Sequence, residues 1–561
     1  MKNSSIQLCL SFCLLFTSTS LYALSSDEAQ NLLDDFEKSY QSNPQETMNR
    51  VGKKTPLQGN GAPSPFELRL KNYDFVVDKD SWRKKICFES SPGVTECLED
   101  VPAGRAPIMG GDLAEELIGS NFSIKSILTM DKQNLKSAKL DETPWSDYYW
   151  PIYSGILGAR YGEYRFSNSE DWLEHLSGNF QYKTKDKKVT YIGERKRGSS
   201  IDNLSPSEKY DLLVGDADFT LTKAMWAQGQ MYYNQNNQKV EKWMGICHGW
   251  AAAAFMLQRP TNKITVKAAN GNTWITFYPS DIKALASLLW ANIQTPSYFI
   301  GGRCNTKEPK TDKPSGRIKD QECFDNNPGS WHKAVVNLIG KKKQSFVMDA
   351  TYDYEVWNQP VYSYNYQYFN PVTMKQTDSI DQATVSKSDF KSSDKFKNFR
   401  DYSSSKFKNV IGVIMEVAYV LETEPTHAAT DSPQKDYVTT AKYIYDLELN
   451  KNGSITGGEW YSNTHPDFLW RPAKKHAYSK VDQASQRVSS HFSSTQGLEG
   501  EYLKLYNYAK TEWDGETAFP QQWSEVAPMA SSYKNRYGQH VGQPLTKVVE
   551  TLITLSRANL K

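Results

Sequence analysis

The sequence predicts an α+β fold with a central core and additional β-containing and helical regions on both sides of it. A helical pattern that starts at Cys247 is followed by separate strand patterns that carry a histidine and an aspartate, an order typical of α+β proteins. Thirty-three tyrosines and fifteen tryptophans among 561 residues indicate a folded chain with a large core rather than a disordered one.

The first 23 residues are predicted to be a cleaved signal peptide. Lys2 supplies a positive start, the apolar run from 6 to 16 is too short to span a bilayer, and Ala23 offers a small residue for cleavage. The mature chain then begins near Leu24. No later stretch reaches the apolar length of a membrane helix. The sequence therefore predicts an exported protein, periplasmic or extracellular, without stable membrane insertion.

Residues 24–140 are predicted to form an N-terminal α/β region. Ser25 and Glu28 have the spacing of a capping box, and the apolar residues that follow recur at helical spacing, so we expect a helix here. Short alternating segments between 66 and 107 indicate strands.

Residues 141–365 are predicted to form the core. The crowded aromatic residues between 145 and 166 favour a packed platform over the wall of a cleft. In order, the expected elements are a helix from Ser205 to Gly215, a helix from Cys247 to Gln258, a strand from Thr273 to Tyr278, a helix capped by Ser280, and two strands, His332 to Ile339 and Ser345 to Thr351.

The C-terminal part is predicted to be β-rich over residues 366–475 and helical over residues 476–561. Beyond residue 361 the chain is expected to begin with tyrosine-rich loops. The later elements are strands at Val410 to Tyr419 and Tyr443 to Leu449, and helices near Gly500 to Thr511 and Leu545 to Ser556.

The charge balance excludes one class of partner. The chain has 66 basic and 64 acidic residues, a formal charge of +2, so it lacks the basic surface expected of a protein that binds nucleic acid.

Five cysteines remain once the signal peptide is removed, and they predict two disulfides. Cys87 and Cys97 flank the turn-like SSPG, while Cys304 and Cys323 bracket a loop rich in Lys, Asp, Pro and Gly. Cys247 is left without a partner.

Cys247 is the predicted nucleophile. It lies in WMGICHGWAAAAF, where a loop becomes a helix, so its sulfur faces the first-turn amides and the positive end of the helix dipole. That setting favours the reactive thiolate. The alternative is a buried cysteine that packs as a small apolar residue.

His332 is the predicted base and Asp349 the residue that orients it. His332 opens an expected apolar strand, and Asp349 ends the neighbouring one, so an antiparallel pair could bring the carboxylate to the imidazole. Alternatively, His332 could bond to backbone and Asp349 could cap a turn. Asp353 is the reserve orienter, and His248 is expected to point to another side of the helix.

Acyl transfer at Cys247 would need donors for an oxyanion. The backbone N–H of Cys247 is the first candidate. The indoles of Trp243 and Trp226 and the amide of Gln238 are alternatives for the second.

Several segments together resemble the transglutaminase-elicitor family: LSPSEKYDLLVGD, WMGICHGWAAAAF, FIGGRC, DNNPGSWH, SFVMDATYDYEVWNQP and HPDFLW. The resemblance covers about residues 140 to 475. It implies a papain/transglutaminase-like cysteine enzyme core that forms glutamine–lysine isopeptide crosslinks through a thioester on Cys247. The implied partners are proteins that bear glutamine and lysine side chains.

The resemblance also implies calcium, although the sequence itself requires no cofactor. The segment from Glu448 to Glu459 fits the spacing of an EF-hand loop. A β-hairpin around Asn452 and Gly453 explains the same residues.

Two other functions remain open. Water could resolve the thioester, which would make the chain a deamidase or protease with the same three residues. A secreted binding protein on an inactive cysteine-enzyme scaffold is the third possibility.

Overall fold

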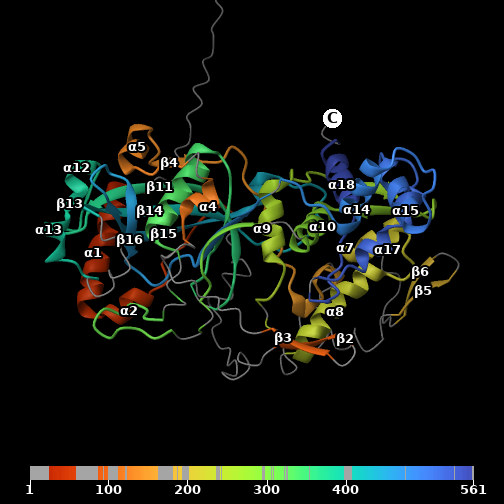
Figure 1. Ribbon diagram of the computed structural model, residues 1–561, viewed down its shortest axis with the longest axis horizontal. Coiled ribbons are helices and arrows are strands. Elements are labelled where there is room, and N and C mark those ends of the chain that lie inside the picture. The colour runs from red at the N-terminus through yellow and green to blue at the C-terminus, as the bar shows by residue number, and fades with distance from the viewer. Residues whose placement is uncertain are drawn as a thin grey trace, which may run out of the picture.

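The computed structural model describes residues 24–58, 86–98, 112–161, 181–192, 201–293, 297–396 and 407–558, with short gaps at 53, 92–93, 120–122, 186–187, 236–240, 242, 305, 307–308, 321–322, 324–325, 353, 474 and 536. Helices and antiparallel strands are mixed in it, as the sequence predicts (Figure 1). The predicted signal peptide lies outside the described residues.

An antiparallel sheet of eleven strands forms the centre of the described chain. Its main path runs β1-β15-β14-β11-β10-β17-β9, while β16 pairs with β15, β13 with β14, and β4 and β12 with β11. The bounds are β1 (Thr55–Gln58), β4 (Ser137–Lys139), β9 (Ser297–Gly301), β10 (Val347–Asp349), β11 (Asn358–Asn370), β12 (Lys375–Thr377), β13 (Thr384–Ser386), β14 (Asn409–Leu421), β15 (Tyr437–Leu449), β16 (Ile455–Trp460) and β17 (Phe468–Pro472).

The interior strand β14 is almost completely buried. Its sequence, NVIGVIMEVAYVL, is nearly continuous in apolar residues, and every residue after Asn409 is buried. A strand that is covered on both faces has this composition. The predicted strands at Val410 to Tyr419 and Tyr443 to Leu449 are therefore confirmed as parts of β14 and β15.

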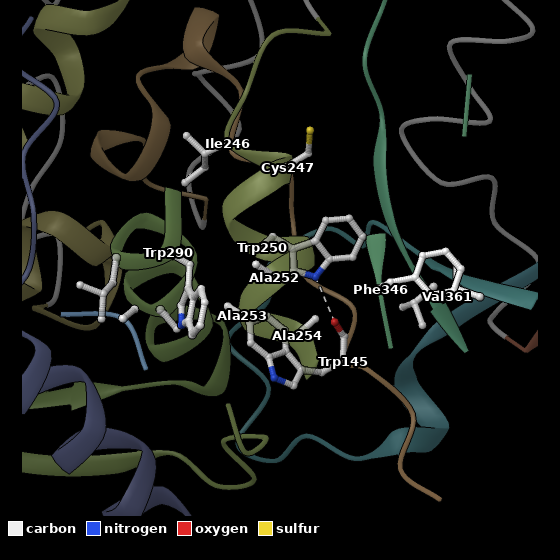
Figure 2. Close-up of a cluster of buried hydrophobic side chains, with 14 of the residues drawn as sticks. Trp145, Ile246, Cys247, Trp250, Ala252, Ala253, Ala254, Trp290, Phe346 and Val361 are labelled. Atoms are coloured by element: carbon white, nitrogen blue, oxygen red, sulfur yellow. Dashed lines mark hydrogen bonds between the residues drawn. The ribbon is translucent and has the colours of Figure 1, made fainter. Parts of the chain in front are cut away.

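Two helices, α9 (Cys247–Met256) and α10 (Pro279–Ala291), pack together beside the sheet (Figure 1). The predicted helices at these positions are confirmed, but the predicted cap at Ser280 is wrong: Tyr278 is the N-cap of α10, and Ser280 lies in its first turn. A Cβ atom at Gly249 would collide with the carbonyl oxygen of Ser287, so the glycine permits close helix packing. The alanine run of α9 and the large rings of Trp250 and Trp290 fill the adjoining core (Figure 2). Strands β7 (Ile264–Lys267) and β8 (Trp274–Phe277) form the hairpin between the two helices.

The C-terminal helices gather with α7 and α8 at one end of the molecule (Figure 1). Ser205 and Glu208 form the predicted capping box at the start of α7, and Gly215 ends that helix with a positive φ. The bounds are α7 (Pro206–Val214), α8 (Thr220–Gln235), α14 (Lys480–His491), α15 (Gly500–Lys510), α16 (Gln521–Ser524), α17 (Ala527–Ser531) and α18 (Thr546–Ala558). Both C-terminal helices predicted from the sequence are present as α15 and α18.

The N-terminal helices lie at the opposite end (Figure 1). The predicted helix after Ser25 is α1 (Ser26–Ser42), and its residues Leu33 and Phe36 pack in a cluster with residues of β11 and β14. The other short helices are α2 (Pro44–Asn49), α4 (Ala114–Ile118), α5 (Ile127–Lys132), α12 (Ile380–Ala383) and α13 (Lys387–Lys391).

Two further hairpins are described by their backbone: β5 (Gln181–Lys185) with β6 (Lys188–Ile192), and β2 (Ile86–Ser91) with β3 (Val94–Leu98). Cys87 lies directly opposite Cys97 in the second of these. Their disulfide stays a prediction, because the side chains lie outside the described part.

The predicted strand from His332 to Ile339 is wrong. These residues belong to α11 (Pro328–Val335) and to a following turn of π-helix, Val336–Lys341. Asn327 caps α11 through its side chain, and Pro328 occupies the first helical position. The whole helix is buried, so it lacks the polar face that usually reveals a helix in a sequence.

The tyrosine-rich loops expected after residue 361 are also wrong. They form β11, one of the longest strands of the sheet. Tyr364, Tyr366 and Tyr368 alternate with more polar residues, and this period of two is typical of a strand.

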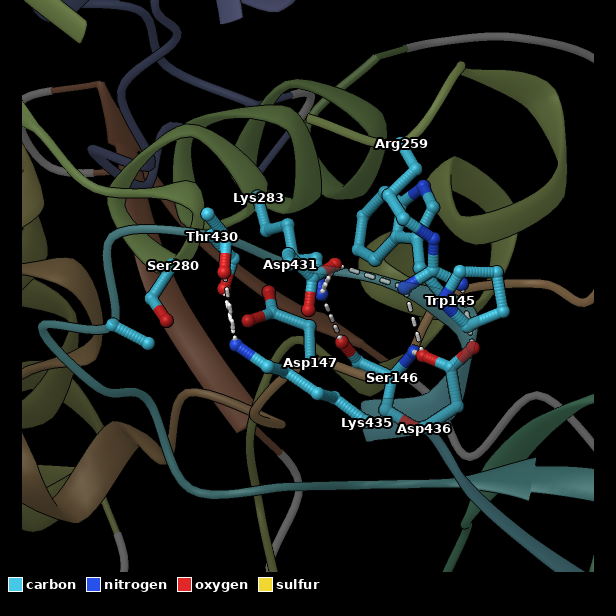
Figure 3. A network of polar contacts seen from close by, with 12 residues as sticks. Trp145, Ser146, Asp147, Arg259, Ser280, Lys283, Thr430, Asp431, Lys435 and Asp436 are labelled. Atoms are coloured by element: carbon cyan, nitrogen blue, oxygen red, sulfur yellow. Dashed lines mark hydrogen bonds and ion pairs between the residues drawn. The ribbon is translucent and has the colours of Figure 1, made fainter. Parts of the chain in front are cut away.

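A buried polar network joins three distant segments of the chain (Figure 3). Arg259, which follows α9, binds Asp436 through both terminal nitrogens, at 2.9 and 2.5 Å, and Asp431 at 2.8 Å. Lys283 of α10 binds Asp431 at 2.8 Å and the carbonyl of Ser146 at 2.8 Å. The network therefore fixes the helix pair against the segment that leads into β15.

One hydrophobic cluster runs from the N-terminal region through the sheet to the C-terminal helices. It includes residues from all four predicted regions of the mature chain, whose boundaries stay a prediction. In the part of the chain that the structure describes, no helix is both long and apolar enough to cross a membrane.

Candidate functional site

Cys247 is the first residue of α9 and the free cysteine of the described chain. It is 5 % exposed, and Figure 2 shows its sulfur at the end of the helix, directed away from the helix body. Cys304 and Cys323 form the predicted disulfide, which is confirmed. The count of cysteines in the sequence therefore correctly predicted that Cys247 has a free thiol.

The loop before α9 is fixed by the aromatic stretch around Tyr149. The backbone N–H of Ile246 donates to the carbonyl of Tyr149 at 2.8 Å, and that of Ile152 donates to the carbonyl of Met244 at 2.9 Å. Gly245 is needed here because a Cβ atom would collide with the Tyr149 carbonyl. Tyr149 and Trp150 are buried, so the stretch is a packed platform that positions Cys247.

Asn358 is the polar side chain that contacts the sulfur of Cys247. Its Nδ2 lies 3.4 Å from Sγ, and its Oδ1 accepts a hydrogen bond of 2.7 Å from the indole of Trp470. The carbonyl of Val356 lies 3.7 Å from Sγ and accepts from the thiol. Both partners of the sulfur come from the segment 356–358, and Trp470, which holds the Asn358 amide, comes from β17.

Asp349 lies one strand away from Asn358. It ends β10 and stands directly opposite Asn358 in the register with β11. Its Oδ1 accepts hydrogen bonds from the backbone of Trp357 at 2.9 Å and from the backbone and hydroxyl of Thr351 at 3.2 and 2.7 Å. Oδ2 is buried with no partner among the described residues. The prediction that Asp349 ends a strand is confirmed, but the predicted pairing of that strand with a strand of His332 is wrong, because His332 lies in α11 and β10 pairs with β11 and β17.

Burial raises the pKa of the Asp349 carboxyl to about 7, although the donors from Thr351 and Trp357 and the charge of Arg303 oppose the shift. Arg303 belongs to the GGRC segment. Its Nη2 donates to the carbonyl of Tyr354 at 2.6 Å, and its guanidinium lies 5.8 Å from the ring centre of Trp243. A cationic side chain therefore borders this site.

Burial acts against the expected thiolate. Burial raises the pKa of the Cys247 thiol to about 11, while both N–H groups of Asn358 lower it and the carboxylates of Glu422 and Asp349 raise it. Loss of hydration therefore outweighs the donors. The raised pKa favours the protonated thiol at neutral pH, so a nucleophilic Cys247 would have to give its proton to a base.

His332 lies apart from these contacts. Its Nδ1 is 2.8 Å from the hydroxyl of Tyr445, and its ring packs edge-on against Tyr366. Burial lowers its pKa to about 3, so the ring is neutral. Within the described residues no hydrogen bond or ion pair joins His332 to Cys247 or to Asp349. Asp349 therefore lies opposite the residue that contacts the cysteine, whereas His332 packs between Tyr366 and Tyr445.

The remaining candidates do not contact the sulfur either. His248 is exposed on α9, as expected for a residue on another side of the helix. The indole of Trp243 donates to Glu241 at 2.5 Å, and Trp226 packs against Gly155 and Gly158. Asp353 and Gln238 lie outside the described residues.

The proposed EF-hand is a β-hairpin. Glu448 lies in β15 opposite Gly457, and Glu459 lies in β16 opposite Asp446. Gly453 turns the chain with a φ of +72°. Among the residues that the structure describes, no group of three or more His, Cys, Asp or Glu side chains is arranged to hold a metal ion. The hairpin alternative is therefore confirmed for this segment, and the calcium requirement stays a prediction.

A protonated thiol predicts how Cys247 reacts with a small alkylating reagent. Because its pKa is about 11, the thiolate fraction should rise about tenfold per pH unit between pH 7 and 10. We expect the rate of iodoacetamide modification, followed by intact mass, to rise with that slope. A rate that is already level above about pH 6 would show a preformed thiolate and contradict this assignment.

Two substitutions separate a structural His332 from a catalytic one. The amide of asparagine can take the place of Nδ1 and keep the hydrogen bond to Tyr445, so we expect His332→Asn to retain the fold and amine transfer within about tenfold. His332→Ala leaves a cavity and an unpaired hydroxyl, and we expect it to lower the melting temperature. If His332→Asn instead lowered amine transfer by about 10³-fold and left the melting temperature unchanged, His332 would be the catalytic base that the sequence predicts.

Comparison with known proteins adds three findings. A family model described as transglutaminase elicitor matches residues 119–490, which is more than half of the chain. The crystal structure of the GP42 transglutaminase from Phytophthora sojae is similar at 21% sequence identity and a TM-score of 0.44, over 66% of this chain and 94% of that chain. No curated protein matches.

Proposed function

The chain belongs to the transglutaminase-elicitor family, and from that premise we propose that it is a protein-glutamine acyltransferase with Cys247 as nucleophile. The observation that carries the proposal is the setting of this free cysteine within the matched segment. Its sulfur stands at the start of a helix, between a carbonyl acceptor and the amide donor of Asn358. An amide donor in this position can stabilise negative charge on the sulfur or on an oxygen bound next to it.

The proposed reaction has two steps. Sγ attacks the carboxamide carbon of a glutamine side chain, the C–N bond breaks, and ammonia leaves with the thiol proton, so that a thioester remains. The amine of a lysine side chain then attacks the thioester carbon, and the thiol is regenerated as the isopeptide bond forms. The substrates are proteins that bear glutamine and lysine side chains.

The partner roles predicted from the sequence are supported unequally. Asp349 lies opposite Asn358 in the sheet and carries a buried oxygen without a described partner, which supports a role beside the sulfur. His332 would have to leave its hydrogen bond to Tyr445 in order to act as the base.

Hydrolysis by the same cysteine is the second candidate function. Water in place of lysine would convert glutamine to glutamate, or would cleave a peptide bond if one were bound. The protonated resting thiol suits either outcome, because both begin with the same acylation.

The products distinguish these functions. The mature protein is incubated with a glutamine-rich protein and a small primary amine, with calcium or with a chelator, and the acceptor is weighed intact. A mass gain equal to the amine minus ammonia, absent with Cys247→Ala, is the expected result. Deamidation or cleavage alone would make the chain a hydrolase, and no change would favour an inactive binding protein. The two metal conditions test the calcium requirement.

Export is part of the proposal. The Cys304–Cys323 disulfide is typical of proteins that fold outside the reducing cytoplasm. The amino-terminal residue of the protein recovered outside the cytoplasm, expected near Leu24, would test this location.

A further inference from the structure

We propose that Asn358 is a catalytic residue of the Cys247 site, which donates hydrogen bonds to the sulfur and to the oxyanion formed beside it, and that Trp470 is the positioning residue that orients its amide. The inference deepens the proposed function and rests on it. It assigns the oxyanion donor to a side chain 111 positions away from the cysteine.

The contact between Trp470 and Asn358 decides which end of the amide faces the sulfur. The indole N–H can donate a hydrogen bond and cannot accept one. Its nitrogen lies 2.7 Å from one end of the Asn358 amide, so that end must be the oxygen. The NH₂ group must therefore face Sγ, which lies 3.4 Å away.

Both residues are held by the sheet. Asn358 starts β11 opposite Asp349, and Trp470 lies in β17 opposite Val347 of β10. Asn358 is only 4 % exposed. A donor on a strand, with its rotamer fixed by a second strand, is already oriented before charge develops, and such preorganisation is what makes an oxyanion donor effective.

The position of the amide suits the charge that appears in the reaction. When Sγ attacks the carboxamide, the new S–C bond places the oxygen that gains negative charge two bonds from the sulfur. The NH₂ group of Asn358 carries two hydrogens, and its backbone N–H also acts on the sulfur. One residue can thus donate to the thiolate before attack and to the oxyanion afterwards.

The first test replaces Asn358 by leucine, which keeps the size of the side chain and removes its donors. We expect kcat for amine transfer to fall about 10²- to 10³-fold with a KM that changes little. We also expect the pH profile of Cys247 alkylation, measured without substrate, to move upward by about one pH unit. Tyr366→Phe in the same strand is the control, since among the described residues no hydrogen bond joins the Tyr366 hydroxyl to Cys247 or Asn358.

The second test is Trp470→Phe, which keeps a large ring and leaves Asn358 in place. The amide can then rotate, so kcat should fall about tenfold and the alkylation profile should move in the same direction. Combined with Asn358→Leu, it should have no further effect on either quantity. This variant keeps the proposal testable if Asn358→Leu does not fold.

The two readouts separate this inference from the proposed function. Unchanged alkylation profiles in both variants would overturn the inference, whatever the amine-transfer assay shows. A shifted profile with an unchanged kcat would overturn the oxyanion role. If the alkylation profile shifts in the variants but the native protein transfers no amine, Asn358 is a hydrogen-bond donor to the sulfur. Only the acyltransferase assignment is then contradicted.

Discussion

Replacing Cys247 by alanine is expected to lower amine transfer by about 10⁴-fold or more, because the substitution removes the only atom proposed to bond to the substrate. The residual rate should equal that of the uncatalysed mixture. Amine incorporation into a glutamine-rich protein, measured by intact mass at several times, gives both rates.

The same variant should keep its fold. Alanine fits the space of the buried cysteine, and the lost contacts of Sγ are two long hydrogen bonds, 3.4 Å from Asn358 and 3.7 Å to the carbonyl of Val356, so we expect a stability loss of about 1 kcal/mol. Ile246→Val is the matched control, as it removes one methyl group from the neighbouring buried residue without touching the sulfur. Activity in Cys247→Ala within tenfold of the native protein would remove this cysteine from the mechanism.

The sequence identified much of the scaffold that holds this cysteine. The start of α9 could be predicted because a loop gives way to a run of small helix-forming residues, and β14 because its apolar run is long. The helix α11 could not be recognised from its sequence, since it is buried on every side and ends in Val335, and the π-helical turn after it continues with Val336 and Ile339. Branched apolar residues without a polar face have the same appearance in a buried strand.

The site itself was only partly predictable. The count of cysteines predicted that Cys247 is free, and the pattern of a short strand predicted that Asp349 lies at its end. Asn358 lies within VWNQP, a segment already part of the family resemblance, yet its contact with Cys247 depends on the pairing of β10 with β11 and β17. The protonated state of the thiol depends on burial, which local sequence does not specify.

Replacing Arg259 by methionine is expected to be among the most destabilising single changes in the described chain. Arg259 is 9 % exposed and holds Asp436, whose side chain is 1 % exposed, through two hydrogen bonds (Figure 3). Methionine preserves most of the volume but leaves that carboxylate buried without its cation. Breaking one side of a buried ion pair costs about 3–5 kcal/mol, so the melting temperature at pH 7.5 should fall by about 3–4 °C in a chain of this length.

The pH dependence distinguishes an unpaired charge from poor packing. Burial already raises the pKa of Asp436, and Arg259 opposes that shift, so removing Arg259 raises the folded-state pKa further above the unfolded value. A group shifted in this way favours the folded state at low pH and loses that contribution as pH rises through its folded pKa. The deficit of Arg259→Met should therefore be largest above pH 7 and smaller near pH 5.

A second substitution tests that explanation directly. Asp436→Asn in the Arg259→Met background removes the buried charge, so the double variant should be more stable at pH 7.5 than Arg259→Met alone, and its deficit should no longer vary with pH between 5 and 7.5. Lys283 still faces Asp431 in both variants, so that carboxylate contributes equally to the comparison. A deficit of the same size at every pH in Arg259→Met would mean that lost packing, rather than the unpaired charge of Asp436, causes the instability.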